Sequence, residues 1–486
     1  MMIKSKISLI KIFLSFIAIF VLIQSLIGSF LFISGNNQFT INASPPEIHR
    51  SKSVSVQPYW NKTFGWSGSE LSRSMVNCSG GGYVMTGWTD SSGAGQHDAW
   101  LVRTDADGNH LWNYTFGGTE DDYGHQVIEC SGGGFAIVGQ YNKSGGLHGN
   151  PDAWLIRTDA SGNHLWNETY GNTTTEDGGR SIVEFSGGGF VMSGVTITSK
   201  SSDVWLIHVN STGGHEWNRT YGGVAVDRCY QSQSLVECAS GGFLIAGYSL
   251  SYGPGGSDLY LVRTDSSGNM LWNYSYGGID FDRPQGVIEC SDGGFAAIGV
   301  TKSYSVNDKT DLWVVRTSAN GTMLWNKTFG GEEEDWGYHA LEAIDGGLFI
   351  IGSTMSYGIA NTNDVWILRT DIKGNLLWNK TIGDGAGADI GYSIVHNGGR
   401  NFTIAGSTSS YGTGGSDMWL LKVYVDVTPP PSTTQTTPTT LTTPTGTGSI
   451  TGTGTAPASW SLIVTIGALS VIAIPIVTKK RNKKKL

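Results

Sequence analysis

The sequence predicts an all-β fold, a seven-bladed β-propeller with four strands in each blade. The dipeptide Trp-Asn recurs seven times at intervals of 51 to 55 residues, and a second marker, Asp-x-aromatic, also recurs seven times, from Asp98 to Asp417. A fixed period of this length is typical of propeller blades. Gly accounts for 70 of the 486 residues and Trp for 17, a composition that favours short strands joined by tight turns.

The second repeat shows how one unit divides into four strands. Runs of mostly apolar residues predict strand A at His125–Cys130, strand B at Phe135–Gln140, strand C at Ala153–Thr158 and strand D at Leu165–Tyr170. Between strands C and D, the segment Asp159–Gly162 provides the glycine that a tight hairpin turn needs.

The phase of the repeats predicts how the ring closes. The first copy consists of a D strand alone, Trp60–Phe64, and the last copy ends after its C strand, Met418–Val423. We therefore expect the N-terminal strand to complete the seventh blade, which removes the open sheet edge of a linear array. Both Trp series, in strands C and D, are expected to form the core between blades because each ring buries a large apolar area.

Three motifs resemble those of a known group of repeats. They are Asp292-Gly-Gly-Phe295, Asp311-Leu-Trp313 and Trp325-Asn-Lys-Thr-Phe-Gly-Gly331. They are similar to the seven-bladed β-propeller repeats of secreted and surface proteins in archaea and bacteria, and the resemblance covers residues 58–426. It implies the propeller fold and a surface location. It implies no single activity.

The N-terminal segment predicts export. Ile12–Ile33 is an uncharged apolar run of 22 residues that follows three lysines. The run is long for a signal peptide and long enough to span a bilayer. Residues 1–43 are therefore either a cleaved signal peptide or a signal anchor, and residues 44–57 form a linker.

The C-terminal segment predicts a membrane anchor. Residues 460–478 contain no charge and precede a basic tail, 479–486, the pattern of a spanning helix with its positive end in the cytoplasm. Residues 428–459 are dominated by Thr, Pro and Gly, which indicates an extended stalk. The propeller, residues 58–427, is therefore expected outside the cell, attached to the cell membrane by one or two passes.

The charge distribution excludes one class of partner. Nine of the 31 basic residues lie in the two terminal segments, so the middle of the chain holds 22 basic residues against 40 acidic ones. Nucleic-acid binding requires clustered Lys and Arg. We therefore expect no nucleic-acid partner.

Every predicted D strand carries an N-glycosylation sequon, Trp-Asn-x-Ser/Thr. The acceptors are Asn61, Asn113, Asn167, Asn218, Asn273, Asn326 and Asn379. Because D is the outermost strand of a blade, these sites predict a belt of glycans around the rim. The alternative is that one sequon was copied with the repeat and is used partly or not at all.

A carboxylate recurs at one position before strand A. It is found at Glu70, Asp122, Asp177, Asp282, Asp335 and Asp389, whereas a fourth-blade insert shifts Asp227 upstream and places Tyr230 in register. Around a channel mouth, such a ring could bind Ca²⁺, and no other cofactor is expected. The alternative is that each carboxylate caps its own turn, and the same alternative applies to the Asp of each Asp-x-aromatic marker.

Four tyrosines in the loops between strands B and C are candidate ligand contacts. They are Tyr252, Tyr304, Tyr357 and Tyr411. Aromatic rings beside carboxylates can bind sugars, but each ring could instead pack on its own blade.

Two further sets of residues are expected to be structural. Five Glu residues at the end of strand A match five Arg residues in strand C in number, which predicts ion pairs near the channel. The five cysteines are expected to be buried single thiols, because four of them occupy equivalent positions in different blades, too far apart for disulfides.

These observations predict a membrane-anchored extracellular propeller that acts in surface binding, adhesion or envelope interaction. No catalytic residue is assigned, and the protein or carbohydrate ligand is not identified. Two alternatives remain: an extracellular propeller enzyme that acts on glycans or uses a quinone-type cofactor, and a structural component of a cell coat.

Overall fold

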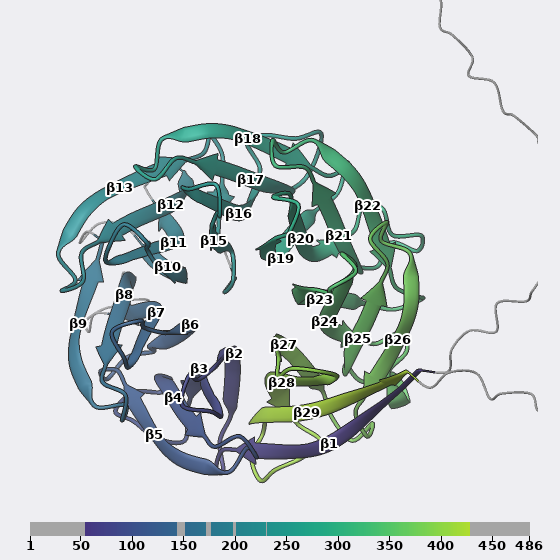
Figure 1. Cartoon of the computed structure of the whole chain (residues 1–486), viewed down its shortest axis with the longest axis horizontal. Helices are drawn as coiled ribbons and strands as arrows, with labels where there is room; N and C mark the ends of the chain where they lie inside the picture. Colours follow the sequence, from purple (N-terminus) through teal and green to yellow (C-terminus); the bar gives the residue numbers. More distant parts are fainter. Residues whose placement is uncertain (1–53, 143–150, 172–175, 198–200, 230, 428–486) are drawn as a thin grey trace, which may run out of the picture. The chain divides into compact units, whose positions relative to one another are not determined.

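The computed structural model describes residues 54–142, 151–171, 176–197, 201–229 and 231–427. These residues form seven antiparallel sheets arranged in a ring around a central axis (Figure 1). The predicted N-terminal signal segment, stalk and C-terminal anchor lie outside these ranges. Within the ranges, no helix is long and apolar enough to cross a membrane.

The first three blades each contain four strands. Blade one consists of β2 (Glu70–Asn77), β3 (Tyr83–Thr89), β4 (Asp98–Thr104) and β5 (His110–Phe116). Blade two consists of β6 (Tyr123–Glu129), β7 (Phe135–Asn142), β8 (Pro151–Thr158) and β9 (His164–Tyr170). Blade three consists of β10 (Glu176–Glu184), β11 (Phe190–Ile197), β12 (Ser202–Val209) and β13 (His215–Tyr221).

The remaining blades follow the same plan, with strand A of blade four divided in two. Blade four consists of β14 (Asp227–Arg228), β15 (Leu235–Glu237), β16 (Phe243–Ser249), β17 (Asp258–Thr264) and β18 (Met270–Tyr276). Blade five consists of β19 (Asp282–Glu289), β20 (Phe295–Thr301), β21 (Asp311–Thr317) and β22 (Met323–Phe329). Blade six consists of β23 (Asp335–Glu342), β24 (Leu348–Thr354), β25 (Asp364–Thr370) and β26 (Leu376–Ile382), with a 3₁₀ turn at Ile359–Asn361. Blade seven consists of β27 (Asp389–His396), β28 (Asn401–Thr408), β29 (Asp417–Val427) and β1 (Val54–Phe64).

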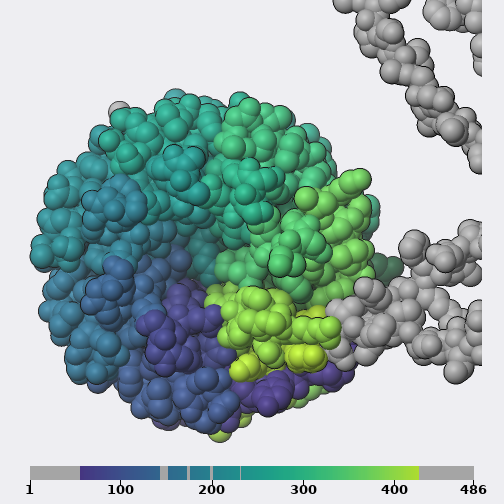
Figure 2. All heavy atoms as spheres, viewed as in Figure 1, coloured from purple at the N-terminus to yellow at the C-terminus, as the bar shows by residue number. Residues whose placement is uncertain are grey.

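The predicted ring closure is confirmed. Strand β1 pairs antiparallel with β29, with Phe64 opposite Met418 and Trp60 opposite Lys422. Figure 2 shows the N-terminal strand in purple lying against the yellow-green C-terminal strand. The seventh sheet therefore joins residues from the two ends of the described chain and has four strands.

The two Trp series differ in burial, which corrects one prediction. The Trp residues of strand C are buried between blades, as expected; Trp313 and Trp366, for example, are each 1% exposed. The Trp residues of strand D are only half-buried, because this strand is outermost. All but Trp378 pack the ring on the hairpin glycine of the next blade: a Cβ on Gly162, which has a φ of 82°, would lie 2.6 Å from the Trp112 ring. The hairpin therefore needs glycine for both its backbone conformation and its contact. Blade seven has no such hairpin, because its strands C and D are β29 and β1.

The predicted ion pairs between strand A and strand C are wrong. Glu129 accepts hydrogen bonds from the backbone N–H of Ser79, at 2.7 Å, and from its hydroxyl, at 2.8 Å, in the turn of the preceding blade. Arg316 pairs with Asp292 of its own A–B turn at 2.5 Å. Equal numbers of Glu and Arg therefore reflect two separate contacts, one between blades and one within a blade.

The five cysteines are buried single thiols, as predicted. Burial raises the pKa of Cys229 and Cys238 to about 12. The reactive thiolate form is therefore scarce at neutral pH.

We predict that the native protein shows no fast-reacting thiol toward a disulfide reagent at pH 8, whereas all five thiols react after unfolding in guanidinium. The physical reason is burial of the sulfur together with its raised pKa. A thiol count in the native state and in denaturant checks this. A native count of two or more would contradict the burial of these residues.

We predict that removal of the residues before Gly65 abolishes cooperative thermal unfolding, because it exposes the edge of β29 and uncovers Trp419 and Leu421. Addition of a synthetic peptide of residues 54–64 should restore the transition, and a scrambled peptide should not. Unchanged melting of the truncated protein would contradict the role of β1 in closing the ring.

Candidate functional site

The centre of the ring is lined by strand A of each blade (Figure 1). In six blades this strand contains a β-bulge, a register shift in pairing with strand B. The bulged residues, which we call the bulge ring, are Arg73, His125, Arg180, Gln285, Tyr338 and Tyr392. A bulge re-aims one side chain out of the regular alternation. The residue at the bulged position varies among the blades.

Members of the bulge ring contact one another across blade boundaries. The Arg73 guanidinium lies 5.6 Å from the centre of the Tyr392 ring, and the rings of Tyr338 and Tyr392 are 4.8 Å apart. The Arg180 side chain is hydrogen-bonded to the His125 ring. Burial, with the nearby Arg180 charge, holds the pKa of His125 well below its usual value. His125 is therefore neutral at pH 7 and accepts the Arg180 N–H.

Blade four has a longer insert in place of the bulge. Its residues 231–234, which we call the plug, lie between β14 and β15 and reach toward the centre of the ring (Figure 1). The Gln231 side chain accepts a hydrogen bond from Arg73 of blade one, at 3.4 Å. The Gln233 side-chain amide donates to the Ser393 hydroxyl of blade seven at 3.0 Å, and its backbone carbonyl accepts from the backbone N–H of Val287 in blade five at 3.0 Å. The insert therefore ties its own blade to three others across the axis.

The structure places each carboxylate of the predicted ring next to an Asp from one of the Asp-x-aromatic markers. At each blade junction, a carboxylate at the start of strand A faces, across a glycine, the marker Asp of strand C in the preceding blade. We call these the junction pairs: Asp417 with Glu70, Asp98 with Asp122, Asp152 with Asp177, Asp203 with Asp227, Asp258 with Asp282, Asp311 with Asp335, and Asp364 with Asp389. The glycines between them are Gly65, Gly117, Gly171, Gly222, Gly277, Gly330 and Gly383, and a Cβ on any of them would lie within 3.0 Å of an oxygen of both carboxylates.

Asp227 belongs to this set, although the sequence placed it out of register. It pairs with Ser249 as Asp282 pairs with Thr301, and its Oδ2 accepts from the Gly223 N–H at 2.7 Å. The insert that displaces Asp227 in an alignment follows it in the chain, so Asp227 keeps its place in the structure. Tyr230 lies outside the described residues.

The strand A carboxylates are buried and do not line an open channel mouth. They hold their own connections, as the turn-cap alternative proposed. Asp335, for example, accepts hydrogen bonds from the Gly331 N–H at 2.9 Å and from the Ser356 hydroxyl at 2.6 Å. Among the described residues, no group of three or more His, Cys, Asp and Glu side chains could hold a metal ion.

Burial makes the charged form of several junction carboxylates costly. Burial, with the neighbouring carboxylate adding to it, raises the pKa of Asp122, Asp258 and Asp311 to about 6. The pKa of Asp364 and Asp389 is raised for the same first reason. The junctions therefore need a compensating positive charge or proton.

The candidate tyrosines lie at these junctions. Three hydroxyl groups donate to carbonyls of junction glycines: Tyr252 to Gly222 at 3.0 Å, Tyr304 to Gly277 at 2.8 Å, and Tyr357 to Gly330 at 2.8 Å. Each ring also packs on the strand C aromatic of its own blade, as Tyr411 does on Trp419, at 5.6 Å. These contacts match the packing alternative, and each ring covers the junction from one side.

The sequon asparagines have a structural contact that the sequence did not suggest. In five blades the side-chain oxygen accepts a hydrogen bond from the buried indole N–H of the strand C Trp; the acceptors are Asn113, Asn167, Asn218, Asn326 and Asn379. In blade seven the indole N–H of Trp419 has no acceptor, so Asn61 does not form this bond. In blade four, strand C of the blade that contains Asn273 has Tyr260 in place of Trp. In the five blades with the bond, the Asn follows the Trp by 13 residues, and this constant separation was the sequence signal that could have predicted the contact.

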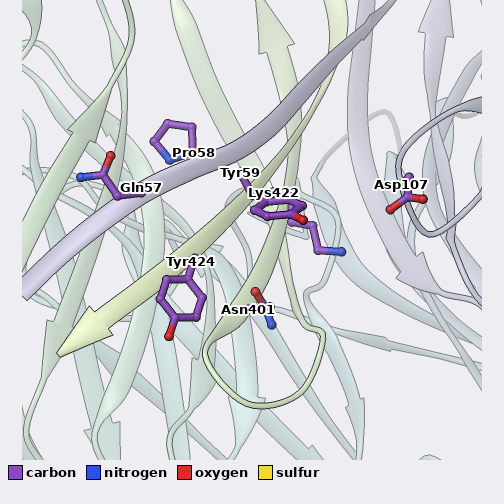
Figure 3. A pocket seen from close by; sticks show the side chains of 7 residues that line it. All are labelled: Gln57, Pro58, Tyr59, Asp107, Asn401, Lys422 and Tyr424. Atoms are coloured by element: carbon purple, nitrogen blue, oxygen red, sulfur yellow. The ribbon is translucent and has the colours of Figure 1, made fainter. Parts of the chain in front are cut away.

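A pocket of about 580 Å³ lies at the closing seam (Figure 3). It is lined by Gln57, Pro58, Tyr59, Asp107, Asn401, Lys422 and Tyr424. The Lys422 ammonium donates to the Ala106 carbonyl at 3.3 Å and lies 5.6 Å from the centre of the Trp60 ring. Lys422 is thus occupied by contacts that fix the seam, and the pocket contains none of the predicted site residues.

Comparisons with known proteins concern only the fold. No family model and no curated protein matches the chain. Among solved structures, it is similar to the WD40 domain of Neurospora crassa Pan2, with 10% identity, a TM-score of 0.48, and coverage of 78% of this chain and 98% of that one. It is also similar to a puromycin hydrolase mutant, with 13% identity, a TM-score of 0.45, and coverage of 70% and 50%. A third is the parainfluenza virus 5 hemagglutinin-neuraminidase ectodomain, with 9% identity, a TM-score of 0.41, and coverage of 78% and 86%.

We predict that Asn379→Ala destabilises the protein by about 1–3 kcal/mol even in a host that does not glycosylate, because the buried Trp366 N–H loses its acceptor. Thr381→Val removes the same sequon and keeps the Asn379 contact, so its effect should stay within about 0.5 kcal/mol. Denaturant unfolding of both variants measures the difference. Equal stability of the two variants would contradict a structural role for this asparagine.

Proposed function

We propose that this chain is an extracellular, membrane-anchored propeller that binds a ligand or partner at the cell surface and catalyses no reaction. The proposal includes N-glycosylation on the rim and kinship with the propeller repeats of secreted and surface proteins of archaea and bacteria. The sequence supports the location through its apolar termini, its stalk and its sequons. The structure supports the binding role through the bulge ring.

The single observation that carries the binding role is the variation within the bulge ring. Junction carboxylates, hairpin glycines and strand C aromatics recur around the ring, and this recurrence is what the propeller requires. The bulged position is Arg, His, Arg, Gln, Tyr and Tyr in the six blades that contain it. A position freed from the fold's constraints at the centre of a rigid ring is suited to recognition.

The chemistry of the bulge ring favours a ligand with an anionic group and hydroxyls. Arg73 and Arg180 supply planar donors for a carboxylate or sulfate, in a region of the chain whose net charge is negative. Tyr338 and Tyr392 offer aromatic faces and hydroxyl groups, and all four side chains are half-buried, so part of each remains accessible. An acidic extracellular polysaccharide has these features.

We predict that the protein binds acidic polysaccharides in preference to neutral ones and that Arg73→Gln weakens binding roughly 10- to 100-fold, the value of a charge-assisted hydrogen bond. Arg219→Gln is the matched control, because Arg219 is exposed on the outermost strand and stacks on Trp217 at 5.5 Å. Binding isotherms on an immobilised polysaccharide panel measure the affinities.

The same samples distinguish the other functions. Release of new reducing ends during incubation would show an enzyme that acts on glycans and would overturn the proposal. Binding that Arg73→Gln leaves unchanged would show that the bulge ring is not the site. Regular lattices formed by the protein in the absence of any ligand would favour a coat component.

A further inference from the structure

The junction pairs present an electrostatic problem that the protein side chains do not solve. In six of the seven junctions both carboxylates are at most 4% exposed. Three of these six junctions are Asp258 with Asp282, Asp311 with Asp335, and Asp364 with Asp389. Among the described residues, none of these six carboxylates forms an ion pair with Lys, Arg or His. Buried like charges without a counter-charge are strongly unfavourable, so the compensation must come from solution.

At each of these junctions the strand C carboxylate has an Oδ1 atom without a hydrogen-bond donor; these atoms belong to Asp258, Asp311 and Asp364. Each of these oxygens points to the glycine that separates it from the second carboxylate. The oxygens of the second carboxylate accept hydrogen bonds, as Asp282 does from the Gly278 N–H at 2.8 Å and from the Thr301 hydroxyl, so its position is fixed.

The glycine lets oxygens of the two carboxylates occupy the place that a side chain would fill. A Cβ on Gly277 would lie within 2.7 Å of oxygens from both Asp258 and Asp282. Gly277 has no positive φ, so its backbone conformation does not require glycine. The absence of a side chain therefore follows from the carboxylates and not from the turn.

We propose that these three junctions bind divalent cations, with Ca²⁺ the best chemical match, each held by one oxygen of the strand C Asp and one of the strand A Asp. Ca²⁺ takes oxygen ligands only and tolerates irregular geometry, whereas Zn²⁺ prefers nitrogen and sulfur. Two protein carboxylates leave the rest of the coordination shell to water. The affinity should therefore fall in the millimolar to submillimolar range typical of extracellular modules.

Such an ion would join adjacent blades. Asp258 belongs to β17 of blade four and Asp282 to β19 of blade five, so the bound ion would link two sheets that share no strand. Because the unfolded chain does not bring the pair together, binding would raise the melting temperature. The inference does not depend on the proposed ligand of the bulge ring.

The test uses the full-length chain, purified in detergent and freed of metal with chelator. We expect about two to three bound Ca²⁺ per chain in equilibrium dialysis at 2 mM free Ca²⁺, as a dissociation constant of about 0.1 to 1 mM implies for three sites, and a melting temperature several degrees higher than in chelator. MgCl₂ at equal ionic strength controls for screening. Asp258→Asn should lower the bound Ca²⁺ by one per chain, and Asp311→Asn should do the same at a second junction.

The matched control is Asp265→Asn, in the hairpin of the same blade. Asp265 accepts backbone N–H groups at 2.8 and 2.9 Å, and Asn210 makes the same contacts in blade three, so the change is compatible with the fold. It should leave the Ca²⁺ count unchanged. If a junction variant fails to fold, Tb³⁺ luminescence excited through the aromatic rings of the wild-type protein, and its displacement by Ca²⁺, gives an independent reading.

Three results would overturn the proposal. The first is a melting temperature that responds equally to CaCl₂ and MgCl₂, together with no Ca²⁺ retained in dialysis. That result would mean that protons shared within the pairs, and not cations, compensate the buried carboxylate charge. The second is retained Ca²⁺ whose amount is the same in wild type, Asp258→Asn and Asp311→Asn. The third is the absence of Tb³⁺ emission that Ca²⁺ displaces.

Discussion

The antiparallel pairing of β1 with β29 is the contact on which the rest of the structure depends. A propeller buries each sheet face against the next blade, so the core is complete only when the last blade meets the first. Here that meeting needs a strand from the opposite end of the described chain, with Phe64 opposite Met418. The contact of Arg73 with Tyr392 and the junction at Gly65 both bridge blades one and seven, so they need the closed ring.

In a ring of seven similar blades, most equivalent positions carry similar residues. The positions that differ between blades are therefore informative. Strand C aromatics, hairpin glycines and junction carboxylates recur because each contact between blades is the same contact. The bulged residue of strand A escapes this rule, since it leaves the sheet and meets the axis instead of a neighbouring sheet. The plug is a second exception, because it is an insert that the other blades lack. Through this insert the side chain of Gln233 reaches Ser393 in blade seven.

The sequence predicted the blade count, the strand order and the closure, because markers of fixed period report local structure directly. It did not predict the bulge ring, since a bulge moves a side chain to another face without changing the local composition. It paired Glu with Arg by number and was wrong, because counts do not say that Glu129 reaches the turn of a neighbouring blade. The extracellular location rests on the apolar termini and the sequons, and it stays a prediction.

The junction pairs show how repetition changes the weight of one contact. A single buried pair of acids is already unfavourable, and this chain repeats the pair at every junction, with a glycine between the carboxylates each time. The unfavourable energy therefore adds up around the ring, and whatever compensates it must be available at every copy. At Asp258, Asp311 and Asp364, whose Oδ1 atoms have no donor, no cationic side chain of the described residues forms an ion pair with either carboxylate of the junction. A cation from solution can compensate the carboxylates at every junction without any further change in the repeat. The two carboxylates and the glycine between them therefore act as one unit.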